Sequence, residues 1–241
     1  MSIYYRPGKI LYQGLFLLIL GGLLIQTSGC GYFKWGSGGT KELEQTPEAL
    51  MNEGIDAYQR KKYSKAIEAF QKMKDRFPYN QYAIVAELKL ADSYYLNKDY
   101  ALAATAYKEF EKLHPANEII PYIIFQLGMC YFKEMPTIDR DQSFAIQAAG
   151  EFERLIKTYP QSEYVEKARD NLVIAQKNMV HHEFAIGEFY FKHNKYDAAL
   201  ARFEGILTKY PGISYPKQMD DYIKTSKDKL AKNQTPKIKN P

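Results

Sequence analysis

The chain lacks the short motifs that identify the common classes of enzyme. GxSxG, a P-loop, HExxH and CxxC are all absent from its 241 residues, and these motifs supply nucleophiles, phosphate cradles and metal ligands. Histidine is scarce, with four in the chain. His181 and His182 are adjacent, so on a helix their side chains diverge by about 100°, and Glu183 does not complete a metal site. The sequence therefore predicts a protein that is not an enzyme and that needs no metal and no dissociable cofactor.

The chain also lacks the concentrated positive charge of a nucleic-acid-binding protein. Its net charge is +5, and residues 1–29 hold two basic residues and no acidic one, which leaves +3 for the remainder. Residues 233–241 are polar and show no hydrophobic period, so they indicate a solvated tail. A protein of this charge is not expected to have nucleic acid as a partner.

Long hydrophobic runs are limited to one, near the N-terminus. Arg6 and Lys9 precede an uncharged apolar stretch over Ile10–Ile25, and small residues follow at positions 27–29. This order is typical of a secretory signal peptide, which we assign to residues 1–29. The alternative is a transmembrane anchor, for which about 16 residues interrupted by glycines are marginal against a ~30 Å hydrocarbon core.

Cysteine is nearly absent, and the first of the two stands directly behind this run. The sequence "TSGC", which ends at Cys30, resembles the bacterial lipobox, in which the cysteine is acylated and becomes the first residue after cleavage. Three acyl chains would anchor the protein permanently, since each buried methylene contributes about 0.8 kcal/mol. Gly31 follows instead of aspartate, which by resemblance to lipoprotein sorting rules favours the outer membrane. We therefore expect a covalent lipid on Cys30 and a location at the periplasmic face of the outer membrane.

The second cysteine, Cys130, is left without a partner for an internal disulfide. It lies in "FQLGMCYF", an apolar helical segment, so we expect a small buried side chain there and not a reactive thiol. Residues 30–45 are rich in glycine and serine. This composition predicts a flexible tether between the lipid anchor and the rest of the chain.

A helical pattern recurs in the rest of the chain. Each copy holds a glycine or alanine, then a tyrosine, an alanine, an aromatic residue and a proline. The four sets are Gly54, Tyr58, Ala66, Phe70 and Pro78; Ala91, Tyr94, Ala103, Tyr107 and Pro115; Gly128, Tyr131, Ala148, Phe152 and Pro160; and Gly187, Tyr190, Ala199, Phe203 and Pro211. In every copy the alanine that follows the tyrosine precedes the aromatic by four residues, and the aromatic precedes the proline by eight. This spacing resembles the tetratricopeptide repeat, a helix-turn-helix unit.

The repeat predicts an all-α fold: a right-handed superhelical array of about four to five tetratricopeptide-like hairpins over residues 46–232. Small residues should let paired helices approach closely, aromatic residues should fill the gap to the neighbouring unit, and each proline should end a second helix. The long interval between the third and fourth copies predicts either one kinked helix or two helices over residues 161–192. A C-terminal helix over Pro216–Lys232 is expected to cap the stack.

Longer segments carry a more specific resemblance. The chain reads "AIEAFQKMKDRFPYNQYAIVAELKLADSYY" in the first two copies, "IDRDQ" ahead of "AAGEFERLIKTYPQSEY" in the third, and "EFAIGEFYFKHNKYDAALARFEGILTKYPG" in the fourth. From Cys30 to Gly212 it resembles the BamD family, lipoproteins of the outer-membrane β-barrel assembly machinery. The resemblance implies a lipid-anchored scaffold. Its partners would be the periplasmic domains of BamA, other lipoproteins of the assembly complex, and unfolded outer-membrane proteins.

One set of candidate residues concerns the protein partner. The resemblance implies that the last two repeats hold BamA, and charged stretches that interrupt a solenoid are typical of its binding loops. The candidate partner-binding residues are Asp139, Arg140, Asp141, His193 and Lys195. His193 stands where the resemblance leads us to expect an arginine. The alternative for the two aspartates is that they cap the following helix and pair with Arg140.

A second set concerns an extended peptide. Aromatic residues on the concave face of the first two repeats would suit a strand with aromatic side chains, such as the end of an unfolded barrel. The candidate peptide-binding residues are Tyr58, Tyr82, Tyr94 and Tyr95. The alternative is that these tyrosines pack in the core.

Two other functions remain open at this point. One is a different periplasmic tetratricopeptide-repeat lipoprotein, an adaptor for the cell-envelope or Tol-Pal machinery, which would share the "YP-x-S-x-Y" turn. The other is an enzyme in which the repeats are only a platform, although no segment after the array is long enough for a catalytic domain.

Overall fold

A computed structural model describes residues 45–234 of the chain, and this part consists of α-helices without strands. The helices are α2 (Pro47–Gln59), α3 (Tyr63–Arg76), α4 (Ala83–Leu96), α5 (Tyr100–Leu113), α6 (Ile120–Lys133), α7 (Ser143–Thr158), α8 (Val165–Lys192), α9 (Tyr196–Lys209) and α10 (Gln218–Gln234). The predicted signal peptide, Cys30, nearly all of the tether and most of the tail lie outside the described residues.

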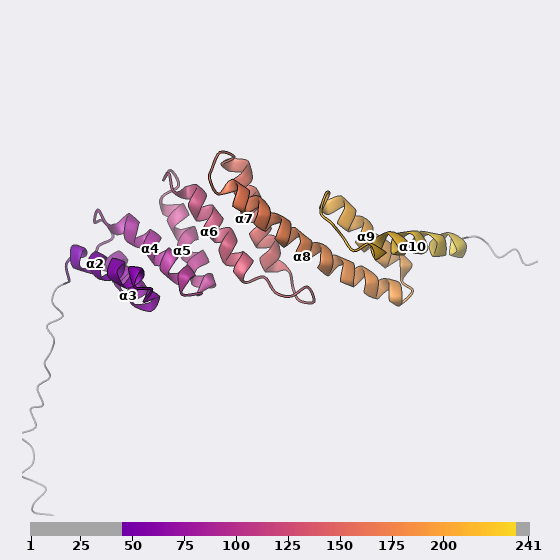
Figure 1. Ribbon diagram of the computed structural model, residues 1–241, viewed down its shortest axis with the longest axis horizontal. Helices are drawn as coiled ribbons and strands as arrows, with labels where there is room; N and C mark the ends of the chain where they lie inside the picture. Colours follow the sequence, from indigo (N-terminus) through magenta and orange to yellow (C-terminus); the bar gives the residue numbers. More distant parts are fainter. Residues whose placement is uncertain (1–44, 235–241) are drawn as a thin grey trace, which may run out of the picture. The chain divides into compact units, whose positions relative to one another are not determined.

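The helices form antiparallel hairpins that follow one another in chain order (Figure 1). Each helix packs mainly against the helices before and after it in the sequence, and the larger contacts beyond these neighbours join α8 to α6 and α10. This nearest-neighbour packing is the arrangement of a helical repeat protein. It confirms the predicted all-α, tetratricopeptide-like array.

In three of the four hairpins the glycine of the repeat is required by a close contact inside the hairpin. A Cβ atom added to Gly54 would lie 2.5 Å from the ring of Phe70, and one added to Gly128 would lie 2.6 Å from the ring of Phe152. Gly187 meets the ring of its hairpin partner in the same way. The repeat predicted that small residues let the paired helices approach closely and that the aromatic residues fill the gap to the neighbouring unit; at these positions the glycine makes room for a ring of its own hairpin. Each phenylalanine ring fills the space over the glycine of its own hairpin, because only a missing side chain leaves room for it.

Three of the hairpins turn through one residue in the left-handed region. These residues are Lys61, Lys98 and Asn194, with φ of 58°, 68° and 58°. An ordinary side chain is uncommon in this region, so its recurrence at the same place shows that the three turns are alike. The third hairpin differs, because the loop between α6 and α7 spans residues 134–142.

The first described helix starts as its sequence predicts. The Thr46 side-chain oxygen accepts a hydrogen bond from the backbone N–H of Ala49 at 3.2 Å, and Pro47 occupies the first turn. Proline is favoured there because its missing N–H has no partner in the first turn of a helix. The last helix starts at Gln218, two residues after the predicted Pro216, and continues to Gln234.

The sequence left open whether residues 161–192 form one helix or two. Residues 165–192 form a single helix of 28 residues, α8. Its first part packs on α7, where Ala175 and Met179 meet Ala145 and Ala149. Its second part packs on α9 in a cluster that contains Val180. The second half of α8 is therefore the first helix of the fourth hairpin, and the first half extends it back to α7. Within residues 45–234 no helix combines the length and apolar character needed to cross a bilayer.

Helix α10 closes the array through an aromatic cluster. The ring of Tyr222 lies 4.3 Å from that of Phe191, 5.9 Å from that of Phe203 and 6.1 Å from that of Phe184, measured between centroids. Met219 is fully buried beside them. This contact covers the apolar face that the fourth hairpin would otherwise expose, as the end of a solenoid requires.

Candidate partner-binding surface

The loop between α6 and α7 is held against α8 by a buried glutamine. Gln142 is only 6% exposed. Its Nε2 donates to the carbonyl oxygens of Thr137 at 3.1 Å and Arg140 at 2.8 Å. Its Oε1 accepts a hydrogen bond from Nδ2 of Asn178, on α8, at 2.7 Å. A buried amide that satisfies its donors and its acceptor in this way fixes the loop in one conformation.

Helix α8 contributes further bonds to the same loop. Nδ2 of Asn178 lies 3.3 Å from the carbonyl oxygen of Pro136, and Nδ1 of His182 lies 2.6 Å from that of Ile138. Because a carbonyl can only accept, His182 carries a hydrogen on Nδ1. Gln142, Asn178 and His182 together bind four loop carbonyls, and we call these three side chains the loop clamp.

The charged residues of the loop point to solvent. Asp139 and Asp141 are exposed, and their pKa values lie below the usual range. The main cause is a hydrogen bond from the Thr137 side chain for Asp139 and from the Ser143 side chain for Asp141. Oδ1 of Asp141 also accepts from the backbone N–H of Ser143 at 2.9 Å, at the first residue of α7. Asp141 therefore binds the first N–H of α7, although the N-cap residue is Gln142, whose side chain makes no cap bond. No ion pair joins Arg140 to either aspartate among the described residues.

The turn after α8 carries the other candidate residues. His193 ends the helix and is exposed, and its Nδ1 lies 2.7 Å from the carbonyl oxygen of Phe189. Its ring is 4.2 Å from the ring of Phe189. The ammonium group of Lys195 lies 6.0 Å from the centre of the Tyr190 ring. Both side chains of the turn thus lie beside aromatic residues of the last turn of α8.

A groove of about 240 Å³ connects the loop to these aromatic residues. Its lining residues are Ile138, Asp139, His182, Ala185, Ile186, Phe189 and Tyr190. The α8 members recur at intervals of three and four residues and so share one face of the helix. From His182 to His193 this face runs for about 16 Å. The structure therefore brings the loop and the turn, which are more than 50 residues apart in the sequence, onto one surface.

The sequence did not reveal the residues that build this surface. It considered His182 only as a metal ligand and rejected that role, and it gave no role to Asn178 or Phe189. Gln142 stood out only as the last residue of the insertion. A polar residue at helical spacing gives no sign of the loop it contacts, because the bonds from α8 to the loop span 36 to 44 residues of sequence.

The candidate peptide-binding tyrosines do not form one site. Tyr82 immediately precedes α4, whereas Tyr94 and Tyr95 lie in its last turn, which places them about 18 Å apart along the helix. Tyr58 and these three residues are half-buried and pack against the core clusters of the first hairpins. Burial raises the pKa of Tyr58 and of Tyr95 to about 12. Packing in the core, the alternative stated above, therefore accounts for much of each side chain.

A buried carboxylate joins the helices that carry these tyrosines. Asp92 of α4 is 5% exposed, and its Oδ1 accepts hydrogen bonds from the hydroxyls of Tyr107 and Tyr122 at 2.8 Å each. Its Oδ2 lies 3.1 Å from Nζ of Lys89, which also lies 4.9 Å from the centre of the Tyr58 ring. The network links α2, α4, α5 and α6. The two hydroxyls have raised pKa values, chiefly through burial.

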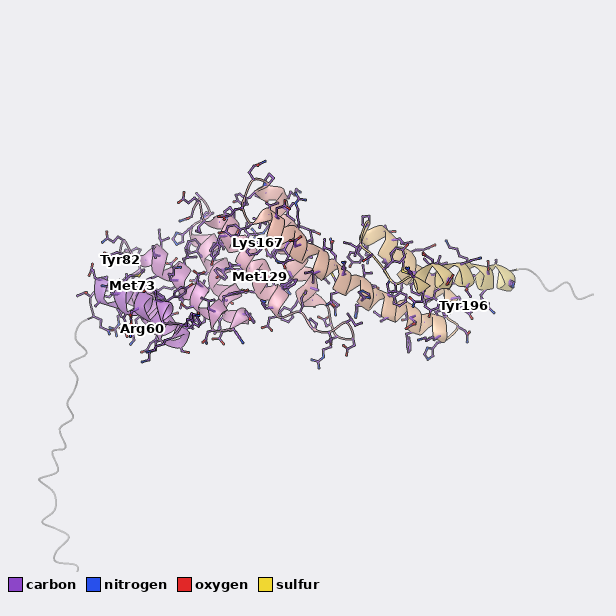
Figure 2. All side chains as sticks on the ribbon, viewed as in Figure 1. Arg60, Met73, Tyr82, Met129, Lys167 and Tyr196 are labelled. Atoms are coloured by element: carbon purple, nitrogen blue, oxygen red, sulfur yellow. The ribbon has the colours of Figure 1, made fainter. Side chains whose placement is uncertain are left out.

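The two candidate sets are well separated along the array. Figure 2 labels Tyr82 in the N-terminal part and Tyr196, the neighbour of Lys195, in the C-terminal part.

Among the described residues no three His, Cys, Asp or Glu side chains converge in a way that could hold a metal ion. Cys130 is buried, and burial raises the pKa of its thiol to about 12, as expected for an inert side chain.

The chain matches a family model and is similar to curated proteins. The family model described as "Outer membrane lipoprotein", named YfiO, matches residues 43–239. The outer membrane protein assembly factor BamD of Caulobacter vibrioides is 25% identical over 206 residues, which cover 85% of this chain and 68% of that protein. The BamD of Rickettsia prowazekii is 32% identical over 161 residues, covering 67% of this chain and 64% of the relative.

Among solved structures, the TPR2AB-domain:pHSP90 complex of yeast Sti1 is similar at 14% identity, with a TM-score of 0.43, over 77% of this chain and 71% of that one. The family model covers most of the chain, including the whole of the helical array. The chain therefore belongs to the YfiO family of outer membrane lipoproteins.

Proposed function

We propose that this protein is a lipid-anchored scaffold subunit of the machinery that assembles β-barrel proteins in the outer membrane. The observation that carries the proposal is its membership of the YfiO family, whose curated relatives are named outer membrane protein assembly factor BamD. The lipid would be attached at Cys30. The scaffold would bind the periplasmic domains of BamA and receive unfolded outer-membrane proteins.

The surface between the loop and the turn is the best candidate for the BamA contact. The loop is held in one conformation by the loop clamp, and a pre-ordered loop loses little entropy when a partner binds. Exposed charges lie at both ends of the surface, at Asp139 and Arg140 on the loop and at Lys195 on the turn. Exposed charges steer partners and set the orientation of a complex.

Mild crosslinking in cells of the source organism, followed by affinity purification, tests the proposal directly. An assembly subunit should be recovered with BamA, with other lipoproteins of the assembly complex and with nascent barrel proteins. Recovery of peptidoglycan or Tol-Pal factors instead, without BamA, would assign the protein to a different envelope machinery.

Charge reversal then locates the contact. We expect Arg140→Glu and Lys195→Glu each to weaken co-purification with BamA by about 1–3 kcal/mol, the scale of removing an interface anchor. The effect should shrink as salt rises, because exposed charges are screened. Lys167→Glu, near the start of α8 (Figure 2), is the matched control and should have no effect. If the double reversal leaves BamA recovery unchanged in a folded protein, the contact lies elsewhere on the array.

The receptor function needs a separate measurement. A fluorescently labelled peptide with aromatic residues, whose sequence is that of the last strand of a barrel protein, is titrated with the Cys30→Ala chain. The fluorescence anisotropy should rise as the complex forms. No rise up to millimolar protein would remove substrate binding from the proposal and leave the scaffold role intact.

A further inference from the structure

We propose that the groove between the α6–α7 loop and α8 takes an apolar side chain of the protein partner, and that this side chain stands next to a lysine or arginine. The proposal deepens the function proposed above, on which the identity of the partner rests. It concerns a different property, the kind of segment that the groove accepts.

The floor of the groove is apolar and open to solvent. Ile138 and Phe189 remain 42% and 56% exposed, although both are large hydrophobic residues. Ala185 and Ile186 also line the groove, and they lie on the same face of α8 as Phe189. Covering such surface with another apolar side chain is favourable by about 25 cal/mol for each Å² removed from water. The groove, at about 240 Å³, is smaller than the ~300–1,000 Å³ of small-molecule pockets, so it suits a single anchoring side chain.

The charge at the edge of the groove selects the neighbour of that side chain. Apart from His182, Asp139 is the only acidic or basic residue among the described residues that line the groove, and its carboxylate is exposed. His182 also lines the groove, but its Nδ1 is bonded to the Ile138 carbonyl. A basic partner residue would therefore meet an opposite charge beside the apolar floor, whereas an acidic one would meet a like charge.

The groove is formed before any partner arrives. The loop clamp fixes the backbone on both sides of Ile138 and Asp139, through bonds of 2.6 to 3.3 Å to the loop carbonyls. A partner therefore does not have to order the loop, and the positions of the apolar floor and the carboxylate are set by α8. This geometry is what lets so small a groove select one side chain and its neighbour.

Site-specific photocrosslinking in the full chain tests the proposal. Phe189 is replaced by p-benzoylphenylalanine in the source organism, the cells are irradiated, and the crosslinked partner peptide is identified by mass spectrometry. We expect a peptide in which the attached or adjacent residue is apolar and next to lysine or arginine. The same replacement at Ile146, an exposed residue of α7, is the control and should not capture that peptide.

The two proposals fail in different ways. A peptide of the expected kind from a protein other than BamA supports the groove and overturns the proposed partner. A BamA peptide without an apolar residue beside a basic one overturns the groove and leaves the proposed function in place. The absence of any crosslink, in a protein that still co-purifies with BamA, also overturns the groove.

Charge variants at Asp139 complete the test. In the photocrosslinking chain, Asp139→Lys should lower the crosslink yield about tenfold, because a like charge then faces the partner. Asp139→Glu should retain most of the yield, and Asp221→Lys on α10 should leave it unchanged. Circular dichroism checks that each variant is folded. Equal yields for Asp139→Lys and Asp139→Glu would show that the carboxylate does not select the partner.

Discussion

The network around Asp92 should contribute a large share of the stability of the first three hairpins. Asp92→Ala removes the acceptor of two tyrosine hydroxyls at 2.8 Å and the ion-pair partner of Lys89 at 3.1 Å. The Tyr107 side chain is fully buried, so no water can replace the lost acceptor. An unsatisfied buried hydroxyl costs the free energy of its desolvation.

The magnitude can be worked from these contacts. A hydrogen bond to a charged group contributes about 1.5–3 kcal/mol, and breaking a buried charged network by removing one partner costs about 3–5 kcal/mol. We therefore expect Asp92→Ala to lower the free energy of unfolding by about 3–5 kcal/mol, a large part of the ~5–15 kcal/mol typical of a domain. Tyr107→Phe should cost about 1.5–3 kcal/mol. Tyr122→Phe should cost less, because Tyr122 is only half-buried and water can reach the groups that lose its hydroxyl.

Urea unfolding followed by circular dichroism measures these differences. The double variant Asp92→Ala with Tyr107→Phe should lose less than the sum of the single losses, by about 0.5–3 kcal/mol, because both changes remove the same bond. Asp170→Ala, at an exposed acid on α8, is the control and should change the free energy by at most about 0.5 kcal/mol. A loss below about 1 kcal/mol for Asp92→Ala, or additive losses in the double variant, would refute this account of the network.

Three further predictions concern the anchor, the hairpin contacts and the buried thiol. Cys30→Ala should release the protein from sedimenting membranes without loss of helical circular dichroism. Ala148→Leu should lower the free energy of unfolding by about 1–3 kcal/mol, since the site is fully buried beside Phe152, and an unchanged thermal midpoint would contradict the assigned register. In the Cys30→Ala chain, Cys130 should react with a thiol reagent at pH 8 only as urea unfolds the protein. Burial raises the pKa of this thiol from 9.0 to about 12, so its contribution to stability should be present below pH 9 and lost as the pH rises from 9 towards 12.

The hairpins were predictable because their packing is local and repeated. Gly54 and Phe70 are 16 residues apart, and the same pair of roles returns at Gly187 and Phe203 with the same separation. A close contact that needs a missing side chain on one helix and a ring on the other leaves a visible trace in the sequence. The turn residues give a weaker trace, because lysine at Lys61 takes a backbone conformation that the sequence does not announce.

The candidate site was predictable only in its exposed part. Charged residues that interrupt a repeat stand out, which is why the sequence suggested Asp139 and Lys195 as candidates. The clamp residue Asn178 could not be found, because a single amide in a long helix has no pattern. The candidate peptide-binding tyrosines show the opposite problem, because the sequence grouped residues that the structure separates. Tyr82 and Tyr95 share a residue type and a repeat, but the length of α4 lies between them.

The length of α8 explains why the loop and the turn share a surface at all. The first helices of the other hairpins, α2, α4 and α6, have 13 or 14 residues, but α8 has 28 residues and extends for about 42 Å. It therefore packs on α7 with one part and on α9 with the other. Beyond the contact with α7, Ala185 and Phe189 of α8 stay exposed. The insertion in the third hairpin reaches this stretch and binds it through Asn178 and His182. The two departures from the repeat thus belong together, since the extended helix supplies the platform and the inserted loop completes the groove.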